Sequence, residues 1–238
     1  MIAEIKKYLR ENRYTRRLYF FLYEIKTYRQ NKEKRTRRKN LRSNGIHLVH
    51  FIQDVLTGED FFFDMGTLLG IIREGRLLRH DMDIDIGVVS QSSDRVEHIR
   101  EALVNQDCSL LKEYVIEGIG VVEDSFLKDG IKFDISYYFD KEDESVVYLM
   151  RKCDNAEFGD KYDVFELSCA PVGEINKIDF FGKKINVPMD SEDYLKTRYG
   201  DNWRIPDKNY KYWEGPSARP TNLKATMIRH EDVSKPNA

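Results

Sequence analysis

A strict alternation of acidic and apolar residues marks one short segment of the chain. Residues 81–86 read Asp-Met-Asp-Ile-Asp-Ile, which is the period of a half-buried strand, so the three acids should share one face. Acids two positions apart on a strand lie roughly 7 Å apart, where two such charges repel by roughly 2 kcal/mol at an effective dielectric of about 20. Asp is also a poor strand former. The pattern therefore favours a strand whose carboxylates share a divalent cation over a solvated edge strand.

The hydrophobic pattern predicts helices on both sides of this strand. Apolar residues recur at spacings of three and four between Tyr14 and Tyr28, so residues 2–30 are predicted as an amphipathic helix. Asn44-Gly45 predicts a break, followed by a helix over residues 46–57. Ser92 or Ser93 is a suitable N-cap for a further helix that ends near Asn105.

Apolar runs and turn residues predict several strands. Residues 131–139 alternate between apolar and polar types and should form a hairpin with residues 126–128 around Asp129-Gly130. Further strands are predicted at residues 61–63, 114–122, 146–150 and 164–167, a second hairpin over 177–187, and a short helix at 191–199 that Gly200 ends. Asp134 is a lone acid in the apolar and aromatic strand, whereas Asp124 and Asp140, the alternative acids, are predicted at strand ends.

A Gly-Thr turn precedes the acidic strand. Gly66 and Thr67 follow the strand at residues 61–63, and this order is typical of a turn whose N–H groups and hydroxyl face an anion at a helix start. Arg73 follows and could hold a phosphate oxygen. Because the turn precedes the Asp-x-Asp-x-Asp strand so closely, the two together predict metal-assisted phosphoryl or nucleotidyl transfer.

Charge is distributed unevenly along the chain. Residues 1–43 hold 15 Lys and Arg against four Glu, whereas the whole chain has a net charge of -2. A basic amphipathic helix with interfacial aromatic residues predicts binding to an anionic membrane surface. The alternative is a helix that packs on the domain and exposes its basic face. Nucleic-acid binding is disfavoured because no recognised reader motif accompanies the charge.

Length and composition set broad limits. With 238 residues, 41% of them hydrophobic and 34% charged, the chain suits a globular protein of one large or two small domains. The chain has three cysteines and no CxxC spacing, so we expect Cys108, Cys153 and Cys169 to be reduced thiols in a cytoplasmic protein. The start of the chain lacks the apolar region of a signal peptide. No apolar run approaches the roughly 20 residues that a membrane-spanning helix needs.

Aromatic residues gather near the end of the chain. Tyr199, Trp203 and Arg204 could bind a base or a sugar, or could belong to a buried cluster that fixes the last helix. From residue 214 onward the chain is rich in Pro, Ser, Lys and Asn and is expected to be flexible. These patterns predict three parts: a basic helical segment at 1–43, a catalytic domain at 44–213, and a flexible segment at 214–238.

The motifs of residues 45–210 resemble those of the LicD family, which is related to fukutin and fukutin-related protein. The resemblance rests on residues 66–70 (Gly-Thr-Leu-Leu-Gly), Arg73, Gly75 and Asp-x-Asp-Ile-Asp, and on the downstream segment through Tyr199-Gly200, Trp203 and Pro206. This chain has Arg79-His80-Asp81 where the family usually has Pro-Trp-Asp, and Met82 where it often has an acid.

The resemblance implies an α+β fold with a nucleotidyltransferase-like mixed sheet flanked by helices, here preceded by the basic amphipathic helix. It also implies a third carboxylate, for which Asp134 is the candidate, beside Asp83 and Asp85 as ligands of Mg²⁺ or Mn²⁺. Asp81 would support this cluster. Gly66, Thr67 and Arg73 would contact the donor phosphate, and His80, Tyr199, Trp203 and Arg204 would contact substrate.

The implied activity is transfer of phosphocholine or a polyol phosphate from CDP-choline, CDP-ribitol or CDP-glycerol to a sugar hydroxyl. The acceptor would be a cell-surface glycan, which can be built on a lipid carrier, so we expect a peripheral position at the inner face of the plasma membrane. Two alternatives stay open: a nucleotidyltransferase that adds a nucleoside monophosphate to a small molecule or protein, and a non-catalytic, membrane-attached interaction protein. The same carboxylates would serve the first alternative.

Overall fold

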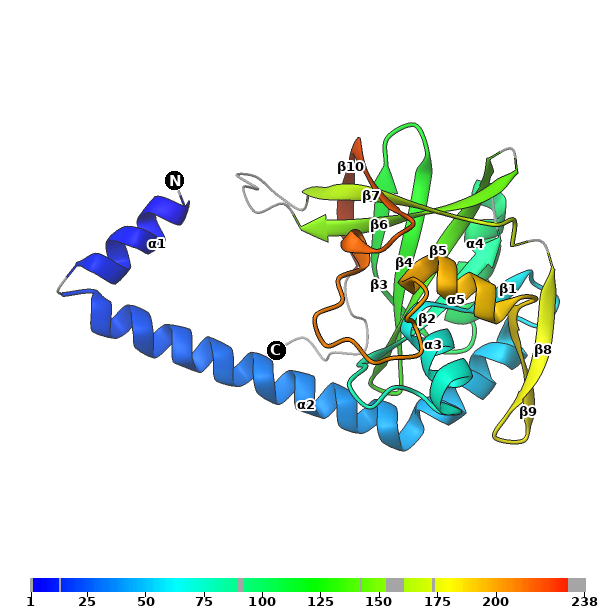
Figure 1. The fold of residues 1–238 in the computed structure, drawn as a ribbon. Coiled ribbons are helices and arrows are strands. Elements are labelled where there is room, and N and C mark those ends of the chain that lie inside the picture. Colours follow the sequence, from blue (N-terminus) through cyan, green and yellow to red (C-terminus); the bar gives the residue numbers. More distant parts are fainter. Residues whose placement is uncertain are drawn as a thin grey trace.

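The computed structural model describes residues 2–12, 14–89, 92–141, 143–152, 161–172 and 174–230, and it shows an α+β protein (Figure 1). Its helices are α1 Ile2–Glu11, α2 Arg16–Val55, α3 Met65–Glu74, α4 Ser93–Val104, α5 Ser191–Tyr199 and the 3-10 helix η1 Tyr212–Glu214. Its strands are β1 Phe61–Phe63, β2 Asp83–Val89, β3 Ser109–Ile116, β4 Gly120–Lys128, β5 Ile131–Lys141, β6 Glu144–Lys152, β7 Lys161–Cys169, β8 Ile175–Phe180, β9 Lys183–Pro188 and β10 Ala218–Arg229. The α+β prediction is confirmed.

Helix α2 is much longer than the sequence pattern predicts. It has 40 residues, about 60 Å at the usual rise, and it continues through Asn44-Gly45, so the predicted break there is wrong. A Cβ atom on Gly45 would lie 2.6 Å from Cδ1 of Leu77. The glycine is therefore explained by close packing of the helix rather than by a turn. The helix predicted over residues 2–30 is instead divided between α1, which ends at Glu11, and α2.

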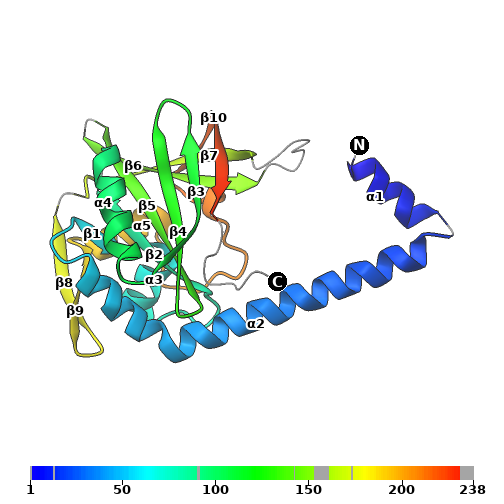
Figure 2. The same ribbon diagram turned by 180° about the vertical axis from the view of Figure 1, so that it is seen from behind.

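The first part of α2 projects away from the rest of the molecule together with α1 (Figures 1 and 2). The buried residues of α2 begin at Leu41, and residues on the projecting part, such as Leu18 and Phe21, are more than half exposed. Within the described residues, no helix is both long and apolar enough to cross a membrane.

The central sheet has eight strands in the order β1-β2-β5-β4-β3-β10-β7-β6. Strands β2 and β5 are parallel, and the other strand pairs among the described residues are antiparallel. Strand β6 also pairs with the end of β5. In spatial order, β5, β4, β3, β10, β7 and β6 therefore form a closed ring of paired strands. A separate hairpin contains β8 and β9.

The two faces of strands β2, β4 and β5 differ in chemistry because successive side chains point to opposite sides. Ile84, Phe126 and Phe133 lie on one face, where they join the buried cluster that includes residues of α2 and α4. The opposite face carries the acids of β2 and the polar residues of β5. Helices α3 and α5 contribute to a second buried cluster with Tyr138 of this face. One face of these strands is therefore covered by the main apolar core, and the other carries the polar residues beside a second buried cluster.

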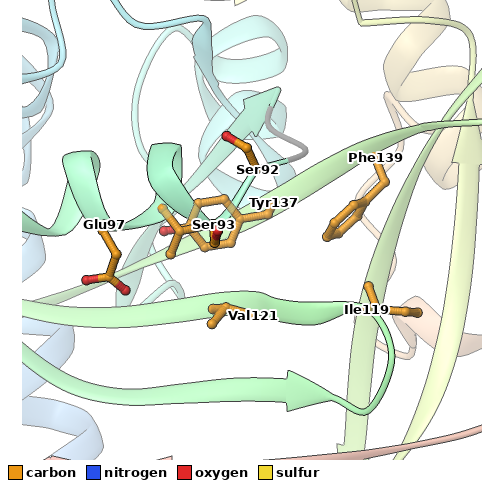
Figure 3. A pocket seen from close by; sticks show the side chains of 8 residues that line it. Ser92, Ser93, Glu97, Ile119, Val121, Tyr137 and Phe139 are labelled. Carbon is orange, nitrogen blue, oxygen red and sulfur yellow. The ribbon is translucent and has the colours of Figure 1, made fainter.

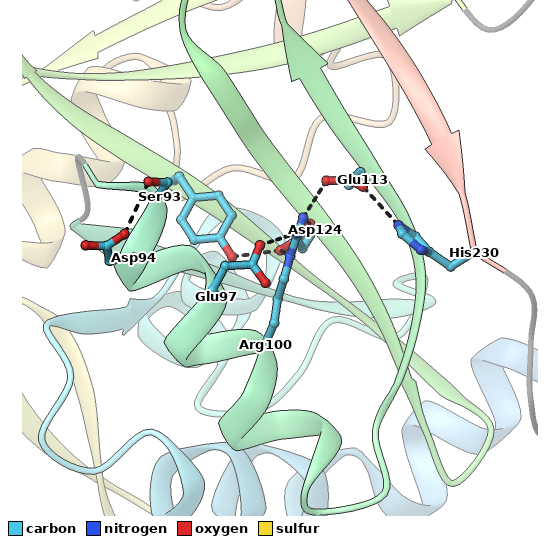
Figure 4. Close-up of polar contacts among 8 residues, drawn as sticks. Ser93, Asp94, Glu97, Arg100, Glu113, Asp124 and His230 are labelled. Atoms are coloured by element: carbon cyan, nitrogen blue, oxygen red, sulfur yellow. Dashed lines mark hydrogen bonds and ion pairs between the residues drawn. The ribbon is translucent and has the colours of Figure 1, made fainter.

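A buried ionic network fixes α4 against the sheet (Figure 4). Arg100 donates to both oxygens of Asp124, at 2.8 and 2.7 Å, and to Oε2 of Glu113 at 2.6 Å. His230 lies 3.0 Å from the other oxygen of Glu113. Asp124 is thus fully buried in the middle of β4, not at a strand end as predicted, and it serves the packing of α4.

The expected flexible segment from residue 214 needs correction. Residues 218–229 form β10, which pairs with both β3 and β7, and Ala225 of this strand is fully buried. The polar composition of the segment reflects a strand whose side chains are mostly exposed on one face. Residues 231–238 lie outside the described residues. Cys108 and Cys169 are buried free thiols, and Cys153 lies outside the described residues.

Candidate active site

Strands β2 and β5 bring the acidic residues together. Their parallel register places Asp85 opposite Asp134 and Asp83 opposite Lys132. The antiparallel pairing of β4 with β5 places Ser125 opposite Asp134, and Lys112 of β3 lies opposite Ser125. One polar row therefore crosses four strands, from Asp85 to Lys112.

Asp134 is held at both carboxylate oxygens. The hydroxyl of Ser125 donates to Oδ1 at 2.5 Å, and the ammonium of Lys132 forms an ion pair with Oδ2. The same ammonium lies 3.1 Å from Oδ2 of Asp83. Lys132 thus bridges the acids of two neighbouring strands, and its side chain is only 15% exposed.

The N-cap residue and the first turn of α3 are hydrogen-bonded to both backbone groups of Asp85. The N–H of Asp64 donates to the carbonyl of Asp85 at 3.0 Å, and the N–H of Asp85 donates to the Thr67 hydroxyl at 2.9 Å. Thr67 is buried, so its hydroxyl supports the strand in this structure, whereas its predicted contact with phosphate stays a prediction. These bonds fix the position of Gly66 against the acidic strand.

Gly66 leaves room for two carboxylates. A Cβ atom at this position would lie 2.8 Å from Oδ2 of Asp81 and 3.5 Å from Oδ2 of Asp85. Any larger residue would therefore displace the Asp81 carboxylate. The acids form two groups: Asp81 and Asp85 converge on Gly66, whereas Asp83 and Asp134 meet Lys132.

Burial and mutual repulsion make the cluster electrostatically strained. Burial, and then the Asp83 carboxylate, raise the pKa of Asp81 to about 7 despite the opposing effect of Arg73. Burial and the charges of Asp83, Asp134 and Asp81 raise the pKa of Asp85 well above its ordinary value. Burial acts to lower the pKa of Lys132, but the Asp134 and Asp83 carboxylates outweigh it and raise this pKa. The cluster therefore attracts additional positive charge.

The donor chemistry of the cluster fits a hard divalent cation. Four carboxylates supply oxygen ligands of the kind that Mg²⁺ prefers, and Gly66 provides the space in which two of them converge. Lys132 already occupies part of the cluster as a cation. Within the described residues, no three acidic, histidine or cysteine side chains are arranged as a ready-made metal site. A cation would therefore need these side chains to adjust around it.

Arg73, the predicted phosphate contact, lies at the edge of the cluster. Its Nη1 donates to the carbonyl of Trp203 at 3.2 Å and its Nη2 to Glu74 at 3.2 Å. Its Nε is buried without a hydrogen-bond partner. Because the charge of Arg73 lowers the pKa of Asp81, the guanidinium lies close enough to act on an anion bound there.

The predicted substrate contacts divide into buried and exposed residues. Trp203 is buried, and the Tyr199 ring packs at a tilt of 45° against the Tyr210 ring, with ring centroids 4.9 Å apart. Arg204 covers the Trp203 ring at 4.2 Å and pairs with Glu192 at the surface. His80 is exposed and lies 3.7 Å from Asp81. Of these residues, His80 is the one that contacts an acid of the cluster directly.

Several residues that the sequence analysis did not single out belong to this region. Lys132 and Ser125 contact Asp134 directly, and Glu123 lies on the same face of β4, where burial and then the Asp134 charge raise its pKa to about 8. The alternation of β5 places Lys132 beside Asp134 on one face, and this signal could have identified it. Ser125 and Glu123 needed the strand pairing, which sequence periodicity does not supply.

A second buried network fixes Asp64, the N-cap residue of α3. Asp64, fully buried, accepts hydrogen bonds from the hydroxyls of Tyr138 at 2.5 Å and Tyr194 at 2.6 Å. Arg198 of α5 lies 3.3 Å from the same carboxylate and also contacts both tyrosines. Asp64 in turn accepts from the N–H of Met65 at 2.6 Å. Helix α5 is thereby joined to the residue that precedes Gly66.

A cavity on the other face of the sheet takes no part in this site. It has a volume of about 100 Å³ and lies between the start of α4 and Tyr137, Ile119 and Phe139 (Figure 3). Ligand pockets usually have volumes of roughly 300 to 1,000 Å³. Tyr137 and Asp134 alternate to opposite faces of β5, so the acids lie across the sheet from this cavity.

Comparison with known families gives the chain its place. The model of the LicD/FKTN/FKRP nucleotidyltransferase domain matches residues 58–190, a range that contains β1, α3, β2 and β5 with all four acids. The chain belongs to this family. Membership in the LicD family confirms the resemblance drawn from the motifs of residues 45–210, of which the family model matches residues 58–190, and with it the nucleotidyltransferase fold.

Relatives of this chain include three that carry the name ribitol-5-phosphate transferase FKTN. Those of Macaca fascicularis and Homo sapiens are 26% identical over 166 residues, and that of Mus musculus is 26% identical over 164 residues. Each match covers 67% of this chain and 32% of the relative, so the chain spans about a third of their length. Among solved structures, ANT(2″)-Ia in complex with adenylyl-2″-tobramycin matches 71% of this chain and 82% of its own, with 15% identity and a TM-score of 0.40.

Proposed function

We propose that this LicD-family chain is a metal-dependent phosphotransferase that moves a substituted phosphate from a CDP-linked donor to a sugar hydroxyl of a glycan. The observation that carries the proposal is the parallel alignment of Asp85 and Asp134 on β2 and β5, next to Gly66 in the first turn of α3. Carboxylates that converge beside a glycine at the start of a helix are suited to bind a cation, and the cation neutralises the phosphates of a donor.

The residues of the cluster would divide the work as follows. Asp83, Asp85 and Asp134 would hold Mg²⁺ or Mn²⁺, and Asp81 would support them. When bound, the metal supplies positive charge that offsets the charge of the donor diphosphate. Gly66 lets the backbone approach a phosphate closely, and the buried Nε of Arg73 is available as a donor to a phosphate oxygen.

The name of the relatives supports a polyol phosphate as the transferred group. They are called ribitol-5-phosphate transferases, and the match covers 32% of each of them. CDP-ribitol is therefore the first donor to test, followed by CDP-glycerol and CDP-choline. The acceptor would be a cell-surface glycan, such as a capsule, lipopolysaccharide or teichoic acid chain.

A panel of donors tests this proposal. The purified protein is incubated with Mg²⁺, each CDP-linked donor and a sugar acceptor, and both products are identified by mass spectrometry. We expect CMP release together with an acceptor that has gained the substituted phosphate. A nucleotide attached to the acceptor would show nucleotidyl transfer instead. No reaction with any donor, with or without acceptor, would favour the non-catalytic alternative.

We also propose that the projecting arm of α1 and α2 attaches the enzyme to an anionic membrane surface. Apolar and aromatic residues are exposed along it, among them Tyr14, Leu18, Phe21, Leu22 and Tyr28. Basic residues flank them, and residues 1–43 carry 15 Lys and Arg. This combination suits a helix that lies in the interface between water and lipid. The arm would place the acidic site near acceptors built on lipid carriers.

A further inference from the structure

Lys132 lies inside the acidic cluster rather than at its border. It stands opposite Asp83 in the pairing of β2 with β5 and two residues before Asp134 on β5. Its ammonium contacts Oδ2 of both acids. Because parallel strands are held in fixed register by their hydrogen bonds, this position is set by the sheet and not by a mobile loop.

The contacts of Lys132 divide the four carboxylates into two groups. Asp83 and Asp134 share the ammonium, whereas the Oδ2 atoms of Asp81 and Asp85 both approach the position of a Cβ atom on Gly66, at 2.8 and 3.5 Å. In the part of the chain that the structure describes, no Lys, Arg or His side chain forms an ion pair with Asp85. Asp83 and Asp134 therefore already share the ammonium of Lys132. In the second group, Asp85 has no ion-pair partner among the described side chains.

A divalent cation between Asp83 and Asp134 would have to displace the ammonium or accept it as a close neighbour of like charge. Like charges at such separations repel strongly when water is largely excluded, and the Lys132 side chain is only 15% exposed. Ser125 also occupies Oδ1 of Asp134. The position beside Gly66 is different, because the missing Cβ lets two carboxylate oxygens converge there and neither of them is bound to Lys132.

We propose that Lys132 takes the place of one of two cations in the cluster, so that the site binds a single divalent cation on the side of Asp85. Phosphoryl-transfer sites often use two metal ions about 3.5 to 4 Å apart. Here the second positive charge is built into β5. Lys132 acts as a positioning residue, since it fixes Asp83 and Asp134 through their Oδ2 atoms, so that these two acids can reach an ion at Asp85 only through the oxygens that Lys132 does not bind. The proposal rests on the proposed function, because that function supplies the reason for a metal.

Counting bound metal tests this proposal directly. Free Mn²⁺ is measured by electron paramagnetic resonance as Mn²⁺ is added to the full chain in the presence of CDP, which gives the number of ions bound per chain. We expect one Mn²⁺ for the wild type, two for Lys132→Met, and one for Lys132→Arg, which restores the positive charge. A merely structural role for Lys132 would not change this number.

Two results would overturn the proposal. One is a wild-type protein that binds two Mn²⁺, and the other is a folded Lys132→Met variant that still binds one. The wild-type measurement keeps the test decisive even if Lys132→Met does not fold, which circular dichroism will show. Lys128→Met is the matched control, because Lys128 lies on the neighbouring β4 and donates to the carbonyl of Gln106, away from the acids. Its count should stay at one.

The donor panel separates this proposal from the proposed function. A wild-type protein that releases CMP and binds two Mn²⁺ would retain the phosphotransferase activity and exclude the role of Lys132. A wild-type protein that binds no Mn²⁺ with CDP present would contradict both the metal dependence and the inference drawn from it.

Discussion

Asp134 lies opposite Asp85 in the parallel pairing of β5 with β2, although α4 and the hairpin of β3 and β4 intervene in the chain. The backbones of neighbouring strands lie roughly 5 Å apart, so side chains at paired positions on the same face are close neighbours. The two acids are therefore held close together by backbone hydrogen bonds, whatever the repulsion between their charges. A protein tolerates such a contact when another charge compensates it, and Lys132 provides part of that compensation.

Asp83→Asn should abolish turnover without unfolding the protein. The substitution keeps the size of the side chain and removes a negative charge beside Lys132 and Asp85. Metal coordination contributes several kcal/mol to the transition state of phosphoryl transfer, so CMP release should fall by roughly 1,000-fold, or about 4 kcal/mol. Asp107→Asn is the control, because Asp107 is exposed and has a φ of 58° that Asn also tolerates. Activity of Asp83→Asn near that of the control would remove Asp83 from the site.

Gly66→Ala should damage the site through one contact. The new methyl group would lie 2.8 Å from Oδ2 of Asp81, and the helical backbone of α3 accepts alanine without strain. We expect weaker Mn²⁺ binding and at least a tenfold loss of CMP release, with circular dichroism unchanged. The double variant Gly66→Ala/Asp81→Ala should be no worse than Asp81→Ala, because the clash is then absent. Fully additive losses would show that Gly66 acts by another route.

The sequence predicted which side chains of the acidic strand are buried, but it did not predict which residues of other strands lie beside them. Alternation over residues 81–86 predicts correctly that Ile84 and Ile86 are buried while Asp83 and Asp85 face the other side, because a period of two is a local property. The predicted strand is too long at its start, since β2 begins at Asp83 and Asp81 precedes it. It says nothing about which strand lies alongside, so Ser125, Lys132 and Glu123 were not singled out. Strand pairing depends on contacts between distant segments, which no local pattern contains.

The wrong predictions share a physical cause. Gly45 lets α2 pack closely against Leu77, and residues 218–229 form a polar strand inside the sheet, paired with β3 on one side and β7 on the other. In each case tertiary contacts override a local preference that is worth roughly 1 kcal/mol or less. The Arg100 network, which fixes α4 and reaches His230, likewise joins residues that no motif connects (Figure 4).

Asp81 should make the metal-free protein less stable as the pH rises. Burial and the Asp83 carboxylate raise its pKa from the ordinary value of 3.8 to about 7 in the folded protein, so the folded state binds more protons than the unfolded state between about pH 4 and 7. Stability therefore falls with rising pH across this window. Three pKa units correspond to at most about 4 kcal/mol, and the side chain is 19% exposed, so a loss of about 1 to 3 kcal/mol is expected.

Urea unfolding in EDTA at pH 5 and pH 7.5 measures this effect. Asp81→Asn should reduce the difference in unfolding free energy between the two pH values, since it has no carboxyl to ionise. Added Mg²⁺ should stabilise the wild type more at pH 7.5 than at pH 5, because ionised carboxylates bind it. An unchanged difference in Asp81→Asn would assign the pH dependence to other groups, such as Asp85.

Arg198→Met should destabilise the fold far more than Arg204→Met. Arg198 is 3% exposed and lies among Asp64, Tyr138 and Tyr194, so its removal leaves the Asp64 carboxylate buried without a cation. Breaking a buried pair in this way costs about 3 to 5 kcal/mol. Arg204 pairs with Glu192 at the surface, where both side chains are more than half exposed, and such pairs contribute about 0 to 1 kcal/mol. Urea unfolding of both variants gives the comparison, and equal losses would contradict the structural role of Arg198.

The arm formed by α1 and α2 should bind anionic vesicles through a defined stripe. Leu18, Phe21 and Leu22 are each more than half exposed and share one face of α2, because residues three and four apart are neighbours on a helix. Changing all three to Ser should abolish sedimentation with vesicles that contain anionic lipid, while unfolding in urea stays unchanged because none of them is buried.

Ile205→Ser/Phe181→Ser removes exposed apolar surface elsewhere and should sediment like the wild type. Binding should also weaken as salt rises, since charge screening shortens the reach of the basic residues. Equal recovery of the wild type with neutral and anionic vesicles would exclude the membrane role, because a surface with this excess of Lys and Arg should distinguish the two.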